Sequence, residues 1–238
     1  MTKNKKIVAM IPARIGSERL KKKNLALVDN KPLIFYSINA AIKSKIFDDI
    51  YINSDDLIFE DIAKRYKVNF YLRPKHLGSS EARSDDVIFD FLQSFNDVEI
   101  LVWVNSISPL LNSFDISKCI NFFKKKKLDS LILSNTYQVH SYFKDKPINF
   151  SKKGLFSKTQ DLVPVKLLNY SIMMWKKMSF INSYKKKNKS ALFCGKFYPF
   201  SLNKFLPIVK NKYDLNLCAD LIKSDLNRPV KYDRILKI

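Results

Sequence analysis

A chain of 238 residues is long enough for one compact domain with a sizeable buried core, without disulfide or metal staples. Hydrophobic residues make up 46% of the chain and aromatic residues 13%, which excludes an intrinsically disordered protein. The formal net charge is +21, but the lysines fall in scattered runs and not along one periodic face. Composition bias therefore explains this charge better than a nucleic-acid-binding surface does.

The cysteines Cys119, Cys194 and Cys218 lie far apart and form no C-x-x-C pair. Their odd number and their spacing predict reduced thiols and not a disulfide framework or a zinc site. The apolar run after the basic residues 1–6 is too short for a signal peptide, and no apolar stretch reaches the length of a membrane span. We therefore expect a cytoplasmic protein that binds neither membranes nor nucleic acid.

Short apolar runs alternate with helix-like segments through the first half of the chain. The predicted strands are residues 7–11, 49–53, 68–72, 100–104 and 130–133. The predicted helices between them start at Pro32, at Asp56, at a cap formed by Ser84 or Asp85, and at Phe114. This alternation predicts an α/β fold, with a Rossmann-like, mostly parallel sheet flanked by helices.

Residues 138–165 interrupt the alternation, because they are polar and contain prolines and a glycine. We interpret them as an excursion from the sheet. The pattern then returns with a predicted strand at 170–175, a basic loop, a strand at 205–209 and a final helix from Tyr213 to about Leu226. No internal repeat or long linker occurs, so we predict a single domain over residues 1–238 with one inserted element at 138–165.

The loop after the first predicted strand carries the most informative pattern, I-P-A-R-I-G-S-E-R-L-K-K-K-N at residues 11–24. It leaves the carboxyl end of a strand, where open α/β sheets bind ligands. Its cations Arg14, Arg19 and Lys23 are spaced so that a folded-back loop can surround a phosphate chain. It is neither a Walker A loop nor a G-x-G-x-x-G loop. On spacing alone, a phosphate-binding loop and an exposed basic loop both remain open.

The residues around this loop closely resemble the acylneuraminate and deoxy-octulosonate cytidylyltransferases. The family pattern P-A-R-x-x-S-x-R-x-x-x-K, followed by G-K-P-L and S/T-D, corresponds to residues 12–23, 30–34 and 54–56. The similarity continues, more weakly in the second half, through residues 73–77, 82–86, 105–111, 160–162 and 169–172. It spans nearly the whole chain.

The resemblance implies a reaction in which CTP and an acidic keto-sugar, a sialic-acid-like nonulosonate, give a CMP-sugar and pyrophosphate. It also implies a homodimer, in which the element at residues 138–165 closes the active site of the partner subunit. It assigns the triphosphate to Arg14, Ser17, Arg19 and Lys23, with Asn24 beside them, and the cytosine side to Arg73 and Ser84. It assigns binding of the acceptor sugar to Asn105 and Gln160, and catalytic roles to Arg14 and Lys23.

Three departures from the family pattern bear on catalysis. The arginine that ends the family's Q-P-T-S-P-L-R is Leu111 here, and the glycine of its N-G-A-I is Tyr170. The family's I-D-I-D segment, whose carboxylates bind Mg²⁺, reads L-P-I-V at residues 206–209. We therefore predict no metal site on the protein and expect any Mg²⁺ to be carried by the nucleotide. Restoring aspartates at Pro207 and Val209 is expected to raise metal-dependent activity.

Three functional interpretations follow. The leading one is an active cytidylyltransferase. The second is a catalytically impaired or diverged family member that binds a nucleotide or sugar without normal turnover. The third is a basic nucleic-acid-binding protein, which lacks support because the sequence shows no aromatic–basic platform and no recognition helix. Trp103 and Trp175 lie in strand-like runs and are interpreted as core residues, not as base-stacking groups.

Overall fold

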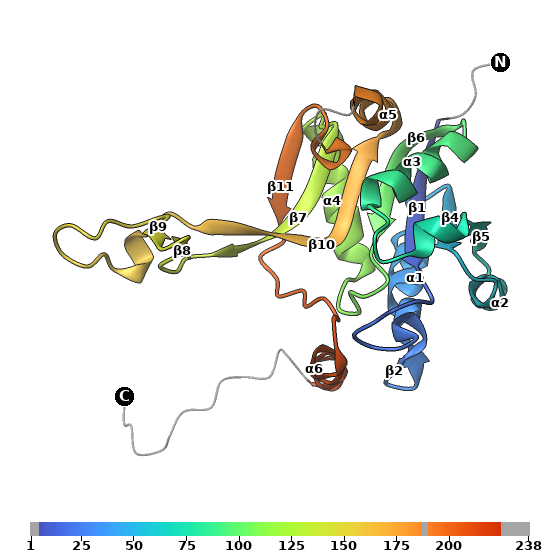
Figure 1. Ribbon diagram of the computed structural model, residues 1–238, viewed down its shortest axis with the longest axis horizontal. Coiled ribbons are helices and arrows are strands. Elements are labelled where there is room, and N and C mark those ends of the chain that lie inside the picture. The colour runs from blue at the N-terminus through green and yellow to red at the C-terminus, as the bar shows by residue number, and fades with distance from the viewer. Residues whose placement is uncertain (1–4, 187–189, 225–238) are drawn as a thin grey trace.

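The computed structural model describes residues 5–186 and 190–224. A seven-stranded sheet forms its centre, with the strand order β11-β7-β10-β6-β1-β4-β5 (Figure 1). Neighbouring strands are parallel except for β10, which runs antiparallel to β6 and β7. The predicted mostly parallel sheet flanked by helices is confirmed. The N-terminal residues 1–4 and the predicted end of the last helix near Leu226 lie outside the described residues.

The sheet consists of β1 (Lys6–Ala13), β4 (Asp49–Ser54), β5 (Asn69–Leu72), β6 (Val98–Val104), β7 (Ser130–Tyr137), β10 (Val165–Lys176) and β11 (Phe197–Ser201). The α-helices are α1 (Leu33–Ser44), α2 (Ile58–Tyr66), α3 (Ser84–Ser94), α4 (Ser113–Lys125), α5 (Lys177–Lys186) and α6 (Lys212–Lys223). The hairpins are β2 (Leu27–Val28) with β3 (Lys31–Pro32), and β8 (Tyr142–Phe143) with β9 (Lys146–Pro147). The 3-10 helices are η1 (Lys23–Leu25), η2 (Lys75–Gly78), η3 (Thr159–Asp161) and η4 (Ala191–Phe193).

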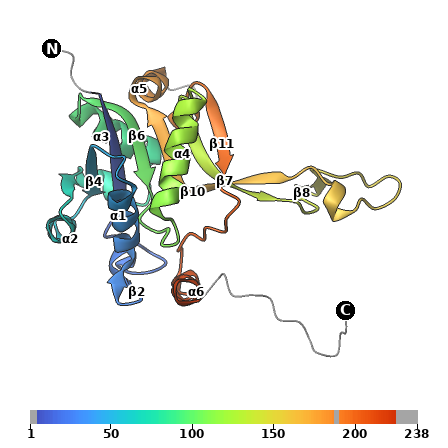
Figure 2. The same cartoon turned by 180° about the vertical axis from the view of Figure 1, so that it is seen from behind.

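Helices cover both faces of the sheet, so its strands read as continuous apolar runs. Residues of β1 alternate between the two faces: Ala9 and Ile11 pack toward α1, α2 and α4, while Val8 and Met10 pack toward α3 and α5. Figures 1 and 2 show these two helical layers from opposite sides. A smaller apolar cluster joins α6 to the region of β2 and α1. Among the described helices, none has both the length and the apolar character that a membrane crossing requires.

The second half of the chain differs from the prediction in two elements. The residues after β10, interpreted as a basic loop, form helix α5, which buries Phe180 and Ile181 against the sheet. The predicted strand at 205–209 is an irregular segment, and the strand in this region is β11, which pairs in parallel with β7. Pro199 fits within β11 because this strand lies at the edge of the sheet, where a missing amide donor is tolerated.

The predicted cap of α3 is also wrong. Ser84 is the first helical residue, and Arg83 occupies the N-cap position without a side-chain hydrogen bond to the helix. The carboxylate of Asp85 instead accepts hydrogen bonds from the Ser190 hydroxyl and from the amide of Ala191. Asp85 therefore connects the start of α3 to η4.

Residues 138–165 form an arm that extends away from the sheet, as the predicted excursion requires (Figures 1 and 2). The ends of β7 and β10 pair at its base, where Tyr137 lies opposite Val165. Farther out, the ring of His140 stacks on Phe156 with 4.1 Å between ring centroids. The arm still exposes large apolar side chains, among them Leu155 at 96%.

Candidate functional site

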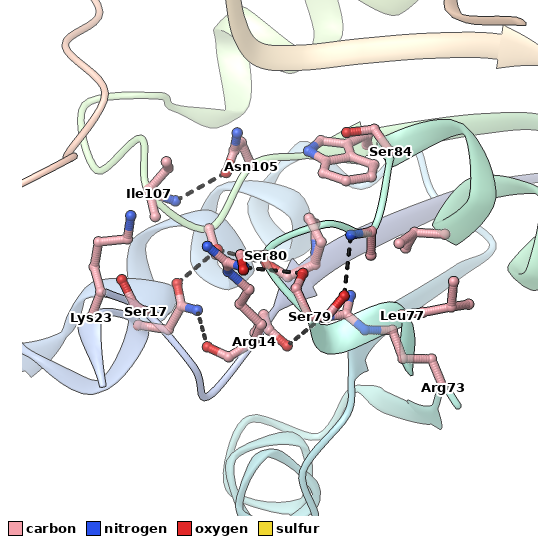
Figure 3. Close-up of a pocket in the computed structure, with 17 residues that line it drawn as sticks. Arg14, Ser17, Lys23, Arg73, Leu77, Ser79, Ser80, Ser84, Asn105 and Ile107 are labelled. Atoms are coloured by element: carbon pink, nitrogen blue, oxygen red, sulfur yellow. Dashed lines mark hydrogen bonds between the residues drawn. The ribbon is translucent and has the colours of Figure 1, made fainter. Parts of the chain in front are cut away.

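A cavity of about 280 Å³ opens at the carboxyl ends of the central strands (Figure 3). Its walls come from the ends of β1 and β6 with the loops that follow them, at residues 12–24 and 103–107, and from the loop after β5 with the first turn of α3, at residues 73–87. The strand order reverses here, because β4 and β5 lie on one side of β1 and β6 lies on the other. Open α/β sheets bind their ligands at this kind of switch point, where the loops of adjacent strands diverge.

Most of the predicted site residues meet in this cavity. Arg19 is exposed on the same loop but does not line the wall. Gln160 lies in the arm, where its carbonyl oxygen accepts a hydrogen bond of 2.6 Å from the side chain of Gln138. The seven predicted residues that line the cavity are Arg14, Ser17, Lys23, Asn24, Arg73, Ser84 and Asn105.

A buried polar network holds the loop after β1 in place. Asn24 is 4% exposed, and its Nδ2 donates to the carbonyl oxygen of Arg14 over 3.2 Å. The hydroxyl of Ser106 lies 2.7 Å from the carbonyl oxygen of Pro12 and 2.8 Å from Asn24 Oδ1, two acceptors available to it. Lys22 adopts a left-handed conformation with φ of 49°, which turns the chain into η1. Asn24 thus fixes the two ends of the loop to each other.

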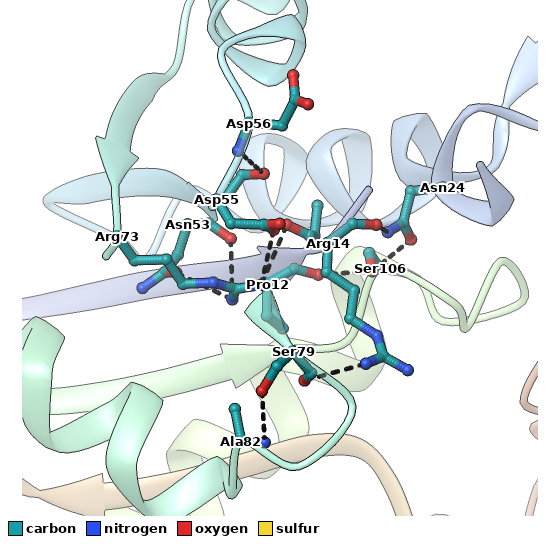
Figure 4. A network of polar contacts seen from close by, with 12 residues as sticks. Pro12, Arg14, Asn24, Asn53, Asp55, Asp56, Arg73, Ser79, Ala82 and Ser106 are labelled. Carbon is teal, nitrogen blue, oxygen red and sulfur yellow. Dashed lines mark hydrogen bonds and ion pairs between the residues drawn. The ribbon is translucent and has the colours of Figure 1, made fainter. Parts of the chain in front are cut away.

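Arg14 connects this loop to the opposite wall. Its Nη1 donates to the carbonyl oxygen of Ser79 over 3.1 Å, and the Ser79 hydroxyl in turn accepts from the amide of Ala82 (Figure 4). Sequence reasoning missed Ser79, Ser80 and Ser106, which all line the cavity. The only sequence signal for the first two was a pair of small polar residues after Gly78, which is typical of a turn.

Lys23 is half-buried on the same wall as Ser17. Burial lowers the pKa of Lys23 below its ordinary value, and the neighbouring cations Arg19 and Arg14 lower it further. Asp214, at the start of α6, opposes this shift. None of the described residues that line the cavity is Asp, Glu or His, so its ionisable lining is entirely cationic. Such an arrangement favours a polyanionic ligand.

Arg73 is 4% exposed and binds the ends of neighbouring strands to one another (Figure 4). Its guanidinium donates to Asn53 Oδ1 and to Asp55 Oδ1, each over 3.2 Å, and lies 3.5 Å from the carbonyl oxygen of Ala13. The Asp55 carboxylate packs so closely against Gly78 that a Cβ added there would overlap it. Burial lowers the pKa of Arg73, and Asp55 counteracts this effect. Arg73 therefore has a bracing role in addition to its place on the cavity wall.

The side-chain amide of Asn105 lines the cavity but already has partners within the protein. Its Nδ2 donates to the carbonyl oxygen of Tyr170 over 3.1 Å, and its Oδ1 accepts from the amide of Ile107 over 3.4 Å. The first of these bonds joins the end of β6 to the irregularity of β10 between Asn169 and Met173. Tyr170, which replaces the family's glycine, is 44% exposed there.

Val209 occupies a position where the fold family implies a metal-binding carboxylate, but its surroundings do not fit a metal ligand. It is fully buried in an apolar cluster with Val28, Leu33 and Cys218, and it does not line the cavity. Its amide donates to the carbonyl oxygen of Ile107 over 2.9 Å. The side chain at position 209 thus faces the packing interface of α6, so an aspartate placed there would lie among apolar groups and not on the cavity wall.

Asp214 does not replace the missing carboxylates. Its Oδ2 accepts from the amides of Lys210 and Asn211 over 2.7 and 3.2 Å, which completes the capping box of α6. Within residues 5–186 and 190–224, no group of three or more His, Cys, Asp or Glu side chains could hold a metal ion.

A cation is present near Leu111 although the family's arginine is absent. Asp115 at the start of α4 is 6% exposed, and its carboxylate lies 2.8 Å from Lys204 Nζ. The same ammonium donates to the carbonyl oxygen of Leu110 over 2.9 Å. The segment before α6 therefore supports the turn after β6 from outside the cavity.

Comparison with known proteins gives a family match and a set of relatives. A family profile described as Cytidylyltransferase matches residues 8–163. An N-acylneuraminate cytidylyltransferase of Streptococcus agalactiae serotype III (strain NEM316) is 27% identical over 207 residues, which cover 84% of this chain and 49% of the relative. A pseudaminic acid cytidylyltransferase of Campylobacter jejuni is 30% identical over 168 residues, covering 66% of this chain and 72% of that protein. The chain thus spans about half the length of the streptococcal relative.

Solved structures share the fold. A structure of CMP:2-keto-3-deoxy-manno-octonic acid synthetase complexed with CTP superposes with a TM-score of 0.70, at 15% identity, over 91% of this chain and 98% of that one. A 4-diphosphocytidyl-2C-methyl-D-erythritol synthase from Anaerococcus prevotii superposes with a TM-score of 0.66, at 14% identity, over 92% of this chain and 99% of that one. At these identities the likeness shows the fold alone.

The substitution Val209→Asp is expected to destabilise the fold, because it places an unpaired carboxylate among apolar side chains. We expect the free energy of unfolding to fall by roughly 3–5 kcal/mol, measured by urea denaturation. Asn203→Asp is the matched control, since it adds a carboxylate at an exposed position of the same segment and should change the stability by at most about 0.5 kcal/mol. Equal stability of the two variants would contradict this placement of Val209.

Proposed function

This chain belongs to the cytidylyltransferase family, and from that premise we propose that it transfers CMP from CTP to an acidic keto-sugar with release of pyrophosphate. The observation that carries the proposal is a cavity at the strand ends whose ionisable lining, among the described residues, consists of Arg14, Lys23 and Arg73. The names of the relatives, N-acylneuraminate and pseudaminic acid cytidylyltransferase, support a sialic-acid-like nonulosonate as the acceptor.

Arg14 and Lys23 suit the phosphate chain of the nucleotide. Arg14 is held by its bond to Ser79 before the ligand arrives, and the left-handed turn at Lys22 sets the backbone of Lys23 at the start of η1. In the proposed reaction the anomeric hydroxyl of the sugar attacks the α-phosphorus and its proton passes to solvent water. The bond from this phosphorus to the oxygen bridging the β-phosphate breaks, and pyrophosphate leaves with the electron pair. Cations near these oxygens stabilise the charge that develops on them.

We also propose that Mg²⁺ enters with the nucleotide. The described residues offer no carboxylate set for it, whereas triphosphate oxygens and water satisfy its preference for oxygen ligands. When bound, the ion supplies additional positive charge to the phosphates. Lys23 and Arg14 remain the protein's own means of holding them.

Turnover is tested by supplying Mg²⁺ and CTP with a panel of nonulosonates and deoxy-octulosonates and by measuring pyrophosphate. We expect release with at least one nonulosonate. CTP binding without release for any sugar would instead identify a member of the family that binds nucleotide without normal turnover. Absence of CTP binding would contradict the proposed function itself.

The substitutions Arg14→Ala and Lys23→Ala should each weaken CTP binding by about 1.5–3 kcal/mol, the usual contribution of a hydrogen bond to a charged group. Calorimetry measures the change. Lys21→Ala is the matched control, because Lys21 is exposed on the same loop and does not line the cavity. If all three variants bind CTP as the unmodified protein does, the phosphate chain lies elsewhere.

CTP affinity should also depend on pH through Lys23, which holds a phosphate only as the ammonium ion. Its pKa lies below the ordinary lysine value of about 10.4. Affinity is therefore full below this lowered pKa and falls as the pH rises through it. Lys23→Arg should move the fall to higher pH, because a guanidinium stays protonated to above about pH 12. Calorimetric titrations over a series of pH values test this, and an identical profile for both proteins would contradict it.

We infer in addition that the chain forms a homodimer through the arm at residues 138–165. The arm exposes apolar side chains such as Phe143 and Leu155, at 65% and 96%, and an exposed apolar surface of this kind marks an interaction site. Its basic residues, including Lys144 and Lys152, would reach the partner's cavity with charges that suit an acidic sugar. The arm extends away from the sheet and does not support it, and a dimer contact would give the arm a function.

Light scattering tests the dimer, which should have about twice the 27.8 kDa mass of the chain. Leu155→Asp should shift the equilibrium toward the monomer, because a charge at the centre of an apolar contact must be desolvated. Phe114→Asp is the control, since Phe114 is 74% exposed on α4 outside the arm and its replacement should leave the mass unchanged. A clean monomer of the unmodified chain would contradict the inference.

A further inference from the structure

The two tryptophans differ in a way that the strand pattern did not reveal. Trp175 is fully buried, and its Nε1 donates to the carbonyl oxygen of Leu192 over 3.0 Å. Trp103 is 9% exposed, and its Nε1 has no hydrogen-bond partner among the described residues. Trp175 is therefore the core residue that was predicted. Trp103 packs in the same apolar cluster but also lines the cavity, so its assignment to the core alone is incomplete.

An unpaired donor of this kind requires an explanation, because the large majority of buried polar atoms in proteins are hydrogen-bonded. Four buried side-chain polar atoms lack a partner within the described part of the chain, and two of them are hydroxyls, whose orientation is free to change. The other two are the nitrogens Trp103 Nε1 and Arg73 Nε. Both nitrogens belong to residues that line the same cavity. Two unpaired donors on one cavity wall point to a ligand that brings acceptor atoms.

The position of Trp103 indicates which part of the ligand carries these acceptor atoms. Figure 3 shows Lys23 and Ser17 at one end of the cavity and Leu77 and Ser84 toward the other. Trp103 belongs to the apolar cluster that includes Leu77 and Val87, both of which line the cavity with it. The tryptophan therefore stands at the end away from Lys23. A flat, partly apolar group with acceptor atoms suits this end, whereas a phosphate chain suits the cationic one.

On the basis of the proposed function, we propose that Trp103 is a nucleobase-contacting residue of this protein. Its indole forms part of the wall against the pyrimidine ring of CTP, and its Nε1–H donates to a ring nitrogen or carbonyl oxygen of the base. Cytosine offers both kinds of acceptor. Uncharged and planar, the indole adds to the contact that Arg73 and Ser84 make on the cytosine side.

The energetics favour this contact. Nε1 is covered from solvent and has no partner in the free protein, so its desolvation is already complete. A ligand acceptor that reaches it therefore removes no water from the donor. Because the atom is covered, the wall must shift slightly as the base enters. The turn at residues 79–83 forms another part of this lining, and the bond from Arg14 to Ser79 joins it to the loop after β1.

Calorimetry with two ligands, CTP and inorganic triphosphate, separates the base from the phosphates. Trp103→Phe keeps an aromatic wall but removes the donor, and it should weaken CTP binding about fivefold to tenfold. Triphosphate binding should change by less than about twofold. Trp175→Phe is the matched control and should leave both affinities unchanged, because Trp175 lies outside the cavity.

Intrinsic fluorescence of the unmodified protein provides a second measurement that does not depend on the folding of a variant. CTP should alter the tryptophan emission, and inorganic triphosphate should not. The assignment of Trp103 is overturned if Trp103→Phe binds CTP as tightly as the unmodified protein, if it loses both ligands equally, or if CTP leaves the emission unchanged. Failure of the unmodified protein to bind CTP overturns the proposed function as well, and so is distinguishable from a failure of the tryptophan assignment alone.

Discussion

The buried guanidinium of Arg73 lies where the carboxyl ends of β1, β4 and β5 come together. Asp55 is its one ion-pair partner among the described residues, and the oxygens of Asn53 and Ala13 are its further acceptors. A buried charge is tolerated only when it is paired and hydrogen-bonded, so the positions of these strand ends are coupled to each other. Gly78 extends the coupling, because only a residue without a side chain lets the next loop approach the Asp55 carboxylate. The cavity wall that follows is positioned by this contact.

A second set of contacts completes the cavity from the other side. Ser106 and Asn24 join the turn after β6 to the loop after β1, and Arg14 joins that loop to Ser79. The three loops are thereby held to one another by polar side chains and backbone oxygens. Lys23 lines the same cavity as Ser17. A charge that is held in place before binding, as that of Arg14 is, stabilises phosphate oxygens with little rearrangement of the protein.

The sequence allowed the strand ends, and so most of the cavity, to be predicted, because apolar runs mark parallel strands and their loops meet at one edge. It did not reveal contacts between segments far apart in the chain. The L-P-I-V pattern at residues 206–209 is equally compatible with a strand and with single side chains buried in different clusters, as Leu206 and Val209 are. Helix α5 was missed because the lysines around Phe180 and Ile181 obscure its short apolar face. The bond from Lys204 to Asp115 has no local signal at all.

Contacts between the cationic lining and the phosphates do not by themselves raise the rate of the chemical step. Contacts to phosphates that change little during the reaction bind the nucleotide and the transition state equally, so they lower KM without raising kcat. Only a group whose contact strengthens as charge moves to the α-phosphate and the leaving oxygen accelerates the chemical step. Arg14 is fixed by Ser79, whereas Lys23 is a flexible point charge with a lowered pKa beside other cations. Under the proposed function, a bound triphosphate relieves the repulsion among these cations. The flexible side chain of Lys23 then allows its ammonium to follow the charge as pyrophosphate departs.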